Sequence, residues 1–206
     1  MRYTTLRVID EGVILYEAHA ARLAPEGGAA RARFDAFAAG AAPGVFALLD
    51  DGERLDVRPR GGSSLVDGMP VRVVTSPVAG LRGPIPKPPP PGPYAAVRAP
   101  GVATLLASPD GAELWESCVA AIVGFDARGL VVVPDDRPRV ASLAEAAVRR
   151  ALPHRVAPIL TSEDLPLLLV NAVKGACRVA APDRRPFPDQ LVREVDALIV
   201  ATARRP

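Results

Sequence analysis

The sequence has very little lysine. Among its 25 basic residues only Lys87 and Lys174 are lysines, and the others are arginines. A lysine that remains where arginine is used so widely is of interest, because some chemistry cannot use arginine. A primary amine can lose its proton and form a Schiff base, whereas a guanidinium group cannot. Both lysines are therefore candidates for amine chemistry.

Aromatic residues and excess charge are also scarce. Aromatic residues make up 4% of the chain, and 25 basic residues nearly balance 23 acidic ones. The sequence therefore lacks the basic footprint and the stacking surface of a nucleic-acid-binding protein. Cys118 and Cys177 have neither a paired spacing nor histidines nearby. This pattern indicates reduced, buried thiols, and we expect no disulfide and no metal site.

Long hydrophobic runs are missing as well. The apolar stretches are short and are interrupted by proline or charge, so no segment is expected to span a membrane. The residues that follow Met1 do not form the apolar core of a signal peptide. We therefore expect a soluble, cytoplasmic protein.

The first 75 residues combine strand and helix patterns. Strands are expected over residues 3–8, 13–16, 44–49, 54–58 and 71–75, and helices over 17–24 and 29–39. Asp50-Asp51-Gly52-Glu53 lies between the third and fourth strands and is a good hairpin signal.

A proline-rich segment follows, in which seven of the ten residues from Pro84 to Pro93 are proline. Proline lacks an amide donor and fixes φ, so this segment is expected to be an extended connector. We place a domain boundary here. The prediction is a mixed α/β (α+β) fold with two domains: a small N-terminal domain over 1–75, a linker over 76–93, and a larger, strand-rich domain over 94–206.

The remaining residues are richer in strand patterns. Strands are expected over residues 102–107, 113–125, 130–133, 167–170 and 176–180, and a closing amphipathic helix over 190–203. A further helix is expected to begin at Ser142. Because Glu145 follows Ser142 by three residues, the pair has the pattern of a capping box.

Several short motifs occur in order along nearly the whole chain. They are Tyr-Thr-Thr-Leu-Arg-Val at 3–8, Glu-Ala-His-Ala-Ala-Arg-Leu at 17–23, Pro-Lys at 86–87 with a tyrosine at 94, Trp-Glu-Ser at 115–117, Val-Pro at 133–134, and Leu-Val-Asn-Ala-Val-Lys-Gly at 169–175. Each motif is weak alone, but their order and spacing resemble the class IV aminotransferases, which are fold-type IV pyridoxal-phosphate (PLP) enzymes. Within that family the sequence is most similar to the 4-amino-4-deoxychorismate lyases.

The resemblance implies a D-amino-acid aminotransferase-like PLP fold and a role for particular residues. Lys87 corresponds to the Schiff-base lysine that also moves protons. Arg22 corresponds to the arginine that binds the cofactor phosphate, and Glu116 to the glutamate that faces the pyridine nitrogen. The phosphate would also be held by the helix start at Ser142 and by the Asn171-Ala172 turn. Lys174 is interpreted as a surface charge in that turn.

The function implied is a PLP-dependent lyase that converts 4-amino-4-deoxychorismate to 4-aminobenzoate and pyruvate in folate biosynthesis. A small-molecule amino substrate and a homodimer are expected on the same ground. Two alternatives stay open: a branched-chain or D-amino-acid aminotransferase, and a non-catalytic homologue. The second alternative is considered because Thr4 and Ala121 depart from the family pattern, a segment that family members carry before the first strand is not found, and prolines surround Lys87.

Overall fold

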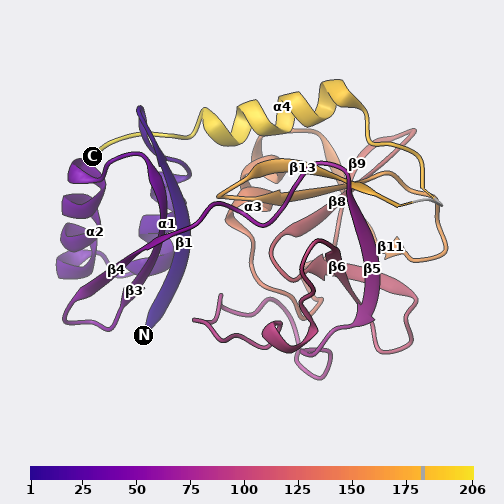
Figure 1. Ribbon diagram of the computed structural model, residues 1–206, viewed down its shortest axis with the longest axis horizontal. Helices are drawn as coiled ribbons and strands as arrows, with labels where there is room; N and C mark the ends of the chain where they lie inside the picture. Colours follow the sequence, from indigo (N-terminus) through magenta and orange to yellow (C-terminus); the bar gives the residue numbers. More distant parts are fainter. Residues whose placement is uncertain (182–183) are drawn as a thin grey trace.

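The computed structural model describes residues 1–181 and 184–206. Within them the chain forms two β-sheets and four α-helices, and the small sheet lies beside the large one (Figure 1). The mixed α/β class predicted from the sequence is confirmed. None of the helices in the described residues is long and apolar enough to cross a membrane.

The small sheet has the strand order β2-β1-β3-β4. Its strands are antiparallel, and two helices pack against it; the bounds are β1 (Arg2–Ile9), β2 (Gly12–Val13), α1 (Tyr16–Leu23), α2 (Gly28–Gly40), β3 (Gly44–Asp50) and β4 (Leu55–Arg60). Alternation along β1 buries Leu6 and Val8, which pack with Phe34 of α2 and Leu48 of β3 in one apolar cluster. The expected hairpin between β3 and β4 is confirmed.

Of the strand expected over 13–16, only Val13 lies in a strand, and the prediction is wrong for residues 14–16. β2 ends at Val13, Leu15 adopts a left-handed conformation with φ 56°, and α1 begins at Tyr16. Ile14 and Leu15 are buried in an apolar cluster that also includes residues of α4 (Asp189–Val200). Tertiary packing therefore overrides the local β pattern here.

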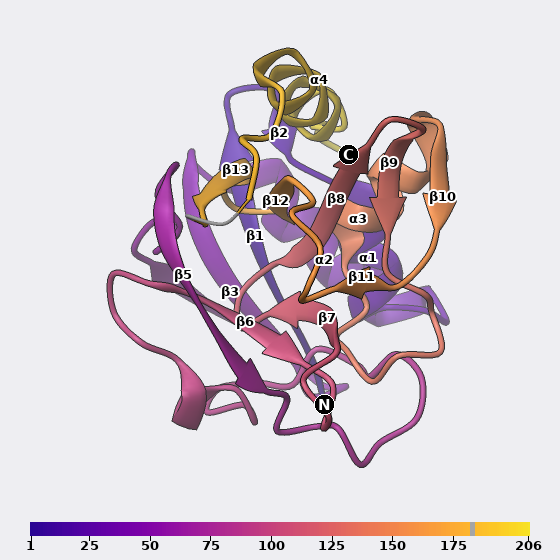
Figure 2. The same ribbon diagram turned by 90° about the vertical axis from the view of Figure 1, so that its right-hand side faces the viewer.

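The large sheet has the strand order β10-β9-β8-β12-β13-β5-β6-β7-β11 and is strongly curled (Figure 2). The bounds of its strands are β5 (Met69–Thr75), β6 (Ala103–Ala107), β7 (Glu113–Ser117), β8 (Ala121–Asp126), β9 (Gly129–Val132), β10 (His154–Val156), β11 (Ile159–Leu160), β12 (Leu167–Asn171) and β13 (Gly175–Ala180). A single-turn 3₁₀ helix, η1 (Ala95–Val97), follows the proline-rich segment.

One expected strand, over 113–125, is in fact two. β7 ends at Ser117. The Ser117 hydroxyl accepts hydrogen bonds from the Val119 and Ala120 amides, at 3.3 and 3.0 Å, and these bonds close a turn. The chain then crosses to β8, which pairs with β9 and β12 and not with β7. A serine that bonds back to the next backbone amides favours a turn over a continuing strand.

The local pattern assigns β5 to the N-terminal domain, but this strand belongs to the large sheet. It lies parallel to β6 and β13 and pairs with both. Parallel pairing with strands far along the chain is invisible to a local pattern, which explains the difference. The chain therefore passes from the small to the large sheet within residues 61–68, ahead of the proline-rich segment.

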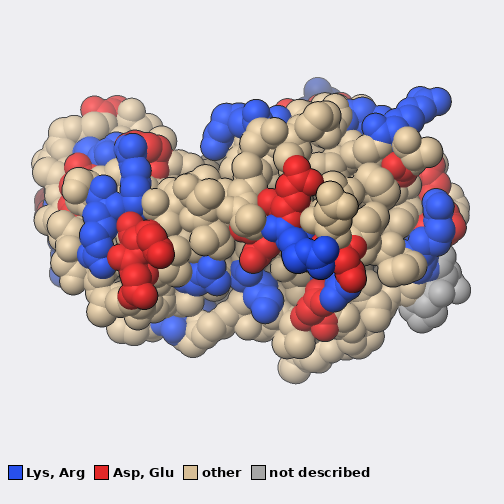
Figure 3. Space-filling model, turned by 90° about the horizontal axis from the view of Figure 1, so that it is seen from above, with Lys and Arg blue, Asp and Glu red and all other residues tan. Residues whose placement is uncertain are grey.

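Helices α3 (Leu143–Ala151) and α4 pack on the large sheet. Apolar residues of both helices share one cluster with residues of β8, β9 and β12. After α4 the chain returns to the small sheet, so the C-terminus lies beside α2 (Figure 1). Seen from above, acidic and basic side chains are interspersed over the surface (Figure 3).

Candidate active site

A cavity of about 340 Å³ lies between the two sheets. Its lining comes from β1 and α1 on one side, from β7 and the 140–144 and 171–173 loops on the other, and from the proline-rich segment that passes across it. Small-molecule sites span roughly 300–1,000 Å³. The cavity is therefore large enough for a compact ligand.

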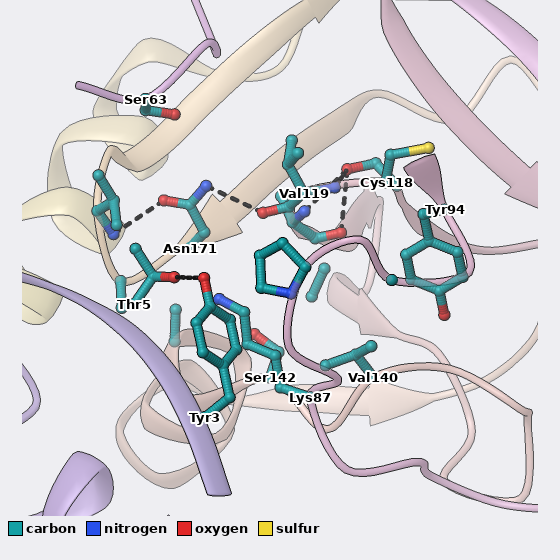
Figure 4. A pocket seen from close by; sticks show the side chains of 18 of the residues that line it. Tyr3, Thr5, Ser63, Lys87, Tyr94, Cys118, Val119, Val140, Ser142 and Asn171 are labelled. Carbon is teal, nitrogen blue, oxygen red and sulfur yellow. Dashed lines mark hydrogen bonds between the residues drawn. The ribbon is translucent and has the colours of Figure 1, made fainter. Parts of the chain in front are cut away.

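Lys87 enters this cavity from the proline-rich segment. The segment is fixed two residues earlier, where the Ile85 amide donates to the Arg139 carbonyl at 2.8 Å and the Ile85 carbonyl accepts from the Ala141 amide at 3.2 Å. The Lys87 side chain reaches toward the Tyr3 ring (Figure 4), with Nζ 5.6 Å from the ring centroid. Flanking prolines thus hold this amine on a stiff backbone.

Burial makes the Lys87 amine less basic. Desolvation is the largest cause, and the nearby charges of Arg22 and Arg60 add to it, so that the pKa of Lys87 falls to about 8. An ordinary lysine is almost fully protonated near neutral pH, whereas this amine has an appreciable neutral fraction. It can therefore give up and take back a proton under mild conditions.

Helix α1 brings Arg22 and His19 to the same wall of the cavity, because residues three apart share a helix face. The Arg22 guanidinium donates to the Ala141 carbonyl, and burial lowers its pKa to about 10. His19 is buried, with Nδ1 2.7 Å from the Thr4 hydroxyl. Among the described residues nothing hydrogen-bonds to its Nε2.

The surroundings of His19 disfavour its charged form. Burial is the main cause of a pKa well below the usual value, and the positive charges of Arg22 and Lys87 lower it further. His19 is therefore neutral near physiological pH. It forms, with Arg22 and Lys87, a group of nitrogen-bearing side chains on one wall of the cavity, and such a group suits an anionic ligand.

Glu116 lies in the cavity lining on β7 and is 4% exposed. Its carboxylate accepts a hydrogen bond from the Tyr94 hydroxyl and from the Val140 amide, the latter at 3.0 Å to Oε1 and 3.2 Å to Oε2. Burial raises the pKa of Glu116 to about 8, although these bonds and the charge of Arg139 act in the opposite direction.

Ser142, Asn171 and Ala172 complete the lining. The Ser142 hydroxyl accepts from the Glu145 amide at 3.2 Å, which confirms the predicted helix cap at the start of α3. Asn171 Oδ1 accepts from the Val173 and Lys174 amides, at 3.0 and 2.7 Å, and fixes the turn between β12 and β13. Residues of the first turn of α3 and of this turn line the cavity, and the free backbone amides at a helix start can bind an anion.

The structure thus brings six predicted residues to one cavity: Lys87, Arg22, Glu116, Ser142, Asn171 and Ala172. Lys174 follows in the same turn but does not line the cavity. Tyr94, the tyrosine of the motif that begins at Pro86-Lys87, is buried and also lines the cavity.

Other lining residues were not identified from the sequence. Tyr3 and Thr5 of β1 both line the cavity and share a hydrogen bond of 2.9 Å (Figure 4). Their spacing of two places them on one face of the predicted strand, and this alternation could have identified them. Arg60 and Arg98 lie far apart in the sequence, and no local pattern marks either of them.

The described residues contain no group of three or more His, Cys, Asp or Glu side chains placed to hold a metal ion. The polar side chains of the cavity include an amine, a guanidinium, an imidazole and a carboxyl group. These are groups that bind and orient an organic ligand and exchange protons with it.

Comparison with solved structures identifies the fold. A hypothetical aminotransferase from Mycobacterium tuberculosis in a PLP-bound form is 18% identical, with a TM-score of 0.63 over 98% of this chain and 88% of that one. The 4-amino-4-deoxychorismate lyase from Pseudomonas aeruginosa is 20% identical, with a TM-score of 0.66 over 97% and 90%. A fold IV transaminase from Curtobacterium pusillum is 20% identical, with a TM-score of 0.64 over 96% and 85%.

At this level of identity the likeness establishes the fold, which is that of the class IV aminotransferases and aminodeoxychorismate lyases. No protein-family model matches the sequence, and no curated protein matches it either.

Proposed function

We propose that the chain is a PLP-dependent enzyme of the fold-type IV class that acts on a small amino substrate. One observation carries this proposal: Lys87, Arg22 and Glu116, which are far apart in the sequence, line a single cavity. Solved structures of the same fold that are described as aminotransferases and lyases, one of them PLP-bound, support it.

The residues present fit this cofactor. A phosphate group needs donors, and the wall formed by α1 supplies the Arg22 guanidinium and the buried, unpartnered Nε2 of His19. The start of α3 offers free backbone amides near Ser142, next to the Ala141 carbonyl that Arg22 contacts. Glu116, which lines the same cavity from β7, suits a protonated ring nitrogen.

When bound, PLP supplies an electron-withdrawing ring that stabilises negative charge on the substrate carbon next to the amine. The chain's own residues then have separate tasks. The Lys87 amine would hold the cofactor covalently and carry protons at Nζ, for which its pKa of about 8 is suited. Arg22 would bind phosphate, and Glu116 would hold the proton at the ring nitrogen.

Within this class we propose the lyase that forms 4-aminobenzoate and pyruvate from 4-amino-4-deoxychorismate. The sequence motifs and the lyase of the same fold support this choice. Incubation with 4-amino-4-deoxychorismate and no amino acceptor should release both products in equal amounts. Turnover that requires a 2-oxo acid as acceptor would instead assign the chain to the transaminases.

We also propose that the chain forms a homodimer, and light scattering of the purified protein would measure its mass in solution.

Borohydride reduction of the protein mixed with PLP, followed by peptide mass mapping, tests the core of the proposal. We expect a pyridoxyl group on Lys87, because burial lowers the pKa of its amine to about 8. Lys87→Arg should remove the adduct and the cofactor's absorbance, since guanidinium forms no such bond.

Lys174→Arg is the matched control, because it removes the other lysine of the chain from outside the cavity. It should leave both signals unchanged. A label on Lys174 in place of Lys87, or no label at all, would overturn the proposal and favour a non-catalytic homologue.

A further inference from the structure

Tyr94 and Glu116 form a buried pair that the roles assigned so far leave unexplained. The Tyr94 hydroxyl donates to Glu116 Oε1, and both side chains are nearly inaccessible, at 8% and 4% exposed. A hydrogen bond between a neutral donor and a carboxylate is stronger when both are removed from water. This contact is therefore a main determinant of how Glu116 is held.

The donors around Glu116 are distributed unevenly. Oε1 accepts from both the Tyr94 hydroxyl and the Val140 amide, whereas Oε2 accepts only from Val140, at 3.2 Å. Oε2 is thus the oxygen with free capacity for a ligand. The contact of Tyr94 with Oε1 fixes the rotation of the carboxylate and so fixes where Oε2 lies.

Tyr94 and Lys87 belong to the same connector. The segment that begins at Ile85 places Lys87 near Tyr3 on one side of the cavity, and it continues through the prolines to Tyr94 beside Glu116. Apolar packing of Tyr94 with Val78 and Leu106 fixes this second point. The connector therefore supplies the amine and also the donor that holds the carboxylate.

We propose that Tyr94 is a positioning residue, which orients the Glu116 carboxylate toward the cavity and favours its ionised form. The inference rests on the proposed function, in which Glu116 faces the ring nitrogen of the cofactor. A carboxylate held in its ionised form keeps a proton on that nitrogen, so Tyr94 would control the protonation of the ring without touching it.

The test is a pH titration of Glu116 by NMR in cofactor-free protein labelled with ¹³C-glutamate, in which Glu116→Gln identifies the resonance. The wild-type carboxyl group should titrate near pH 8. Tyr94→Phe removes the hydroxyl alone, and it should move this midpoint upward by about one pH unit because the ionised form loses its donor. An unchanged midpoint would overturn the proposal.

Tyr16→Phe is the matched control. Tyr16 also donates to a carboxylate, that of Asp35 at 2.5 Å, but it lies in the core of the small sheet, away from the cavity. It should leave the titration of Glu116 unchanged. If Tyr16→Phe produces the same shift as Tyr94→Phe, the effect is a general loss of packing and the proposal is wrong.

Incorporation of 3-fluorotyrosine serves as a second test if Tyr94→Phe fails to fold. Fluorine makes the hydroxyl a stronger donor while keeping its position, so the midpoint of Glu116 should move downward. An upward movement or none would contradict the inference.

These measurements need no cofactor, so the two proposals can fail separately. Absence of a pyridoxyl adduct on Lys87 would reject the proposed function. A normal adduct on Lys87, together with a Glu116 titration midpoint that does not change in Tyr94→Phe, would reject the role of Tyr94.

Discussion

At the scale of single residues, the main feature of the cavity is a wall rich in nitrogen. Arg22, His19 and Lys87 lie close together, and each has a lowered pKa. Burial is the first cause in all three cases. Positive groups such as Arg22 and Lys87 are costly away from water unless an anion joins them, so a phosphate would stabilise this wall as well as be held by it.

Arg22→Gln tests this wall. One charge-assisted hydrogen bond contributes about 1.5–3 kcal/mol, so the variant should bind PLP about 10- to 100-fold more weakly. Binding of pyridoxal, which has no phosphate, should change by less than about threefold on the same scale. Both dissociation constants can be measured by the quenching of Trp115 fluorescence.

Arg31→Gln is the control for this comparison, because Arg31 pairs with Glu17 and Asp35 outside the cavity. Arg31→Gln should leave the dissociation constants of both PLP and pyridoxal unchanged. An equal loss for PLP and pyridoxal in Arg22→Gln would mean that Arg22 does not bind phosphate.

At the scale of elements, the turn between β12 and β13 depends on a single glycine. Gly175 has φ +83°, and a Cβ atom there would collide with Asp196 Oδ1 of α4. The same oxygen accepts from the Ala176 amide at 3.2 Å. The close approach of α4 to this turn therefore requires a residue without a side chain.

Gly175→Ala should destabilise the fold more than Gly111→Ala. Gly111 has a similar φ of +73°, but nothing lies within 4 Å of the position that a methyl group would take there. The left-handed conformation alone costs roughly 1–2 kcal/mol, and overpacking adds about 1–3 kcal/mol. Urea denaturation measures both free energies of unfolding, and equal losses would show that the contact with Asp196 is relaxed at no cost.

Local signals predicted those elements whose partners are near in sequence. The β3–β4 hairpin followed from Asp50 to Glu53, and the start of α3 followed from Ser142 and Glu145. The strand over 71–75 was predicted, but its place in the large sheet was not, because its partners β6 and β13 are contributed by later parts of the chain. Parallel pairing leaves no turn at the point of contact, so it has no local signature.

The residues of the cavity could likewise be predicted only in part from the sequence. Motif order identified Lys87, Arg22 and Glu116, and each of them lines the cavity. The contact of Tyr94 with Glu116 could not be predicted, because it depends on the path of the proline-rich segment along the cavity. The spacing of the two residues in the sequence does not encode that path.

At the scale of the whole molecule, the segment after α4 ties the two sheets together. The Val13 amide donates to the Arg204 carbonyl at 2.9 Å, and the Arg204 amide donates back to the Val13 carbonyl at 3.2 Å. The Leu15 amide donates to the Thr202 hydroxyl at 2.9 Å. Since the cavity lies between the sheets, these contacts help to set its width.

Thr202→Val tests this tie. Loss of one hydrogen bond costs about 1 kcal/mol, so the Leu15 amide should exchange with deuterium roughly fivefold faster if it opens locally. Amides in the core of the large sheet should be unaffected. Thr161→Val is the control, since Thr161 bonds to Gly111 at 2.7 Å within the large sheet; faster exchange at Leu15 in that variant would contradict the assignment.

The same tie has a consequence for biosynthesis. During translation, residues 202–205 emerge from the ribosome after all the strands and helices described above, yet they cover β2 and contact α2 in the small sheet. The small sheet, which is synthesised first, therefore cannot complete its edge at β2 until residues 202–205 have been synthesised. We expect nascent chains stalled within α4 to keep β2 open and accessible to chaperones.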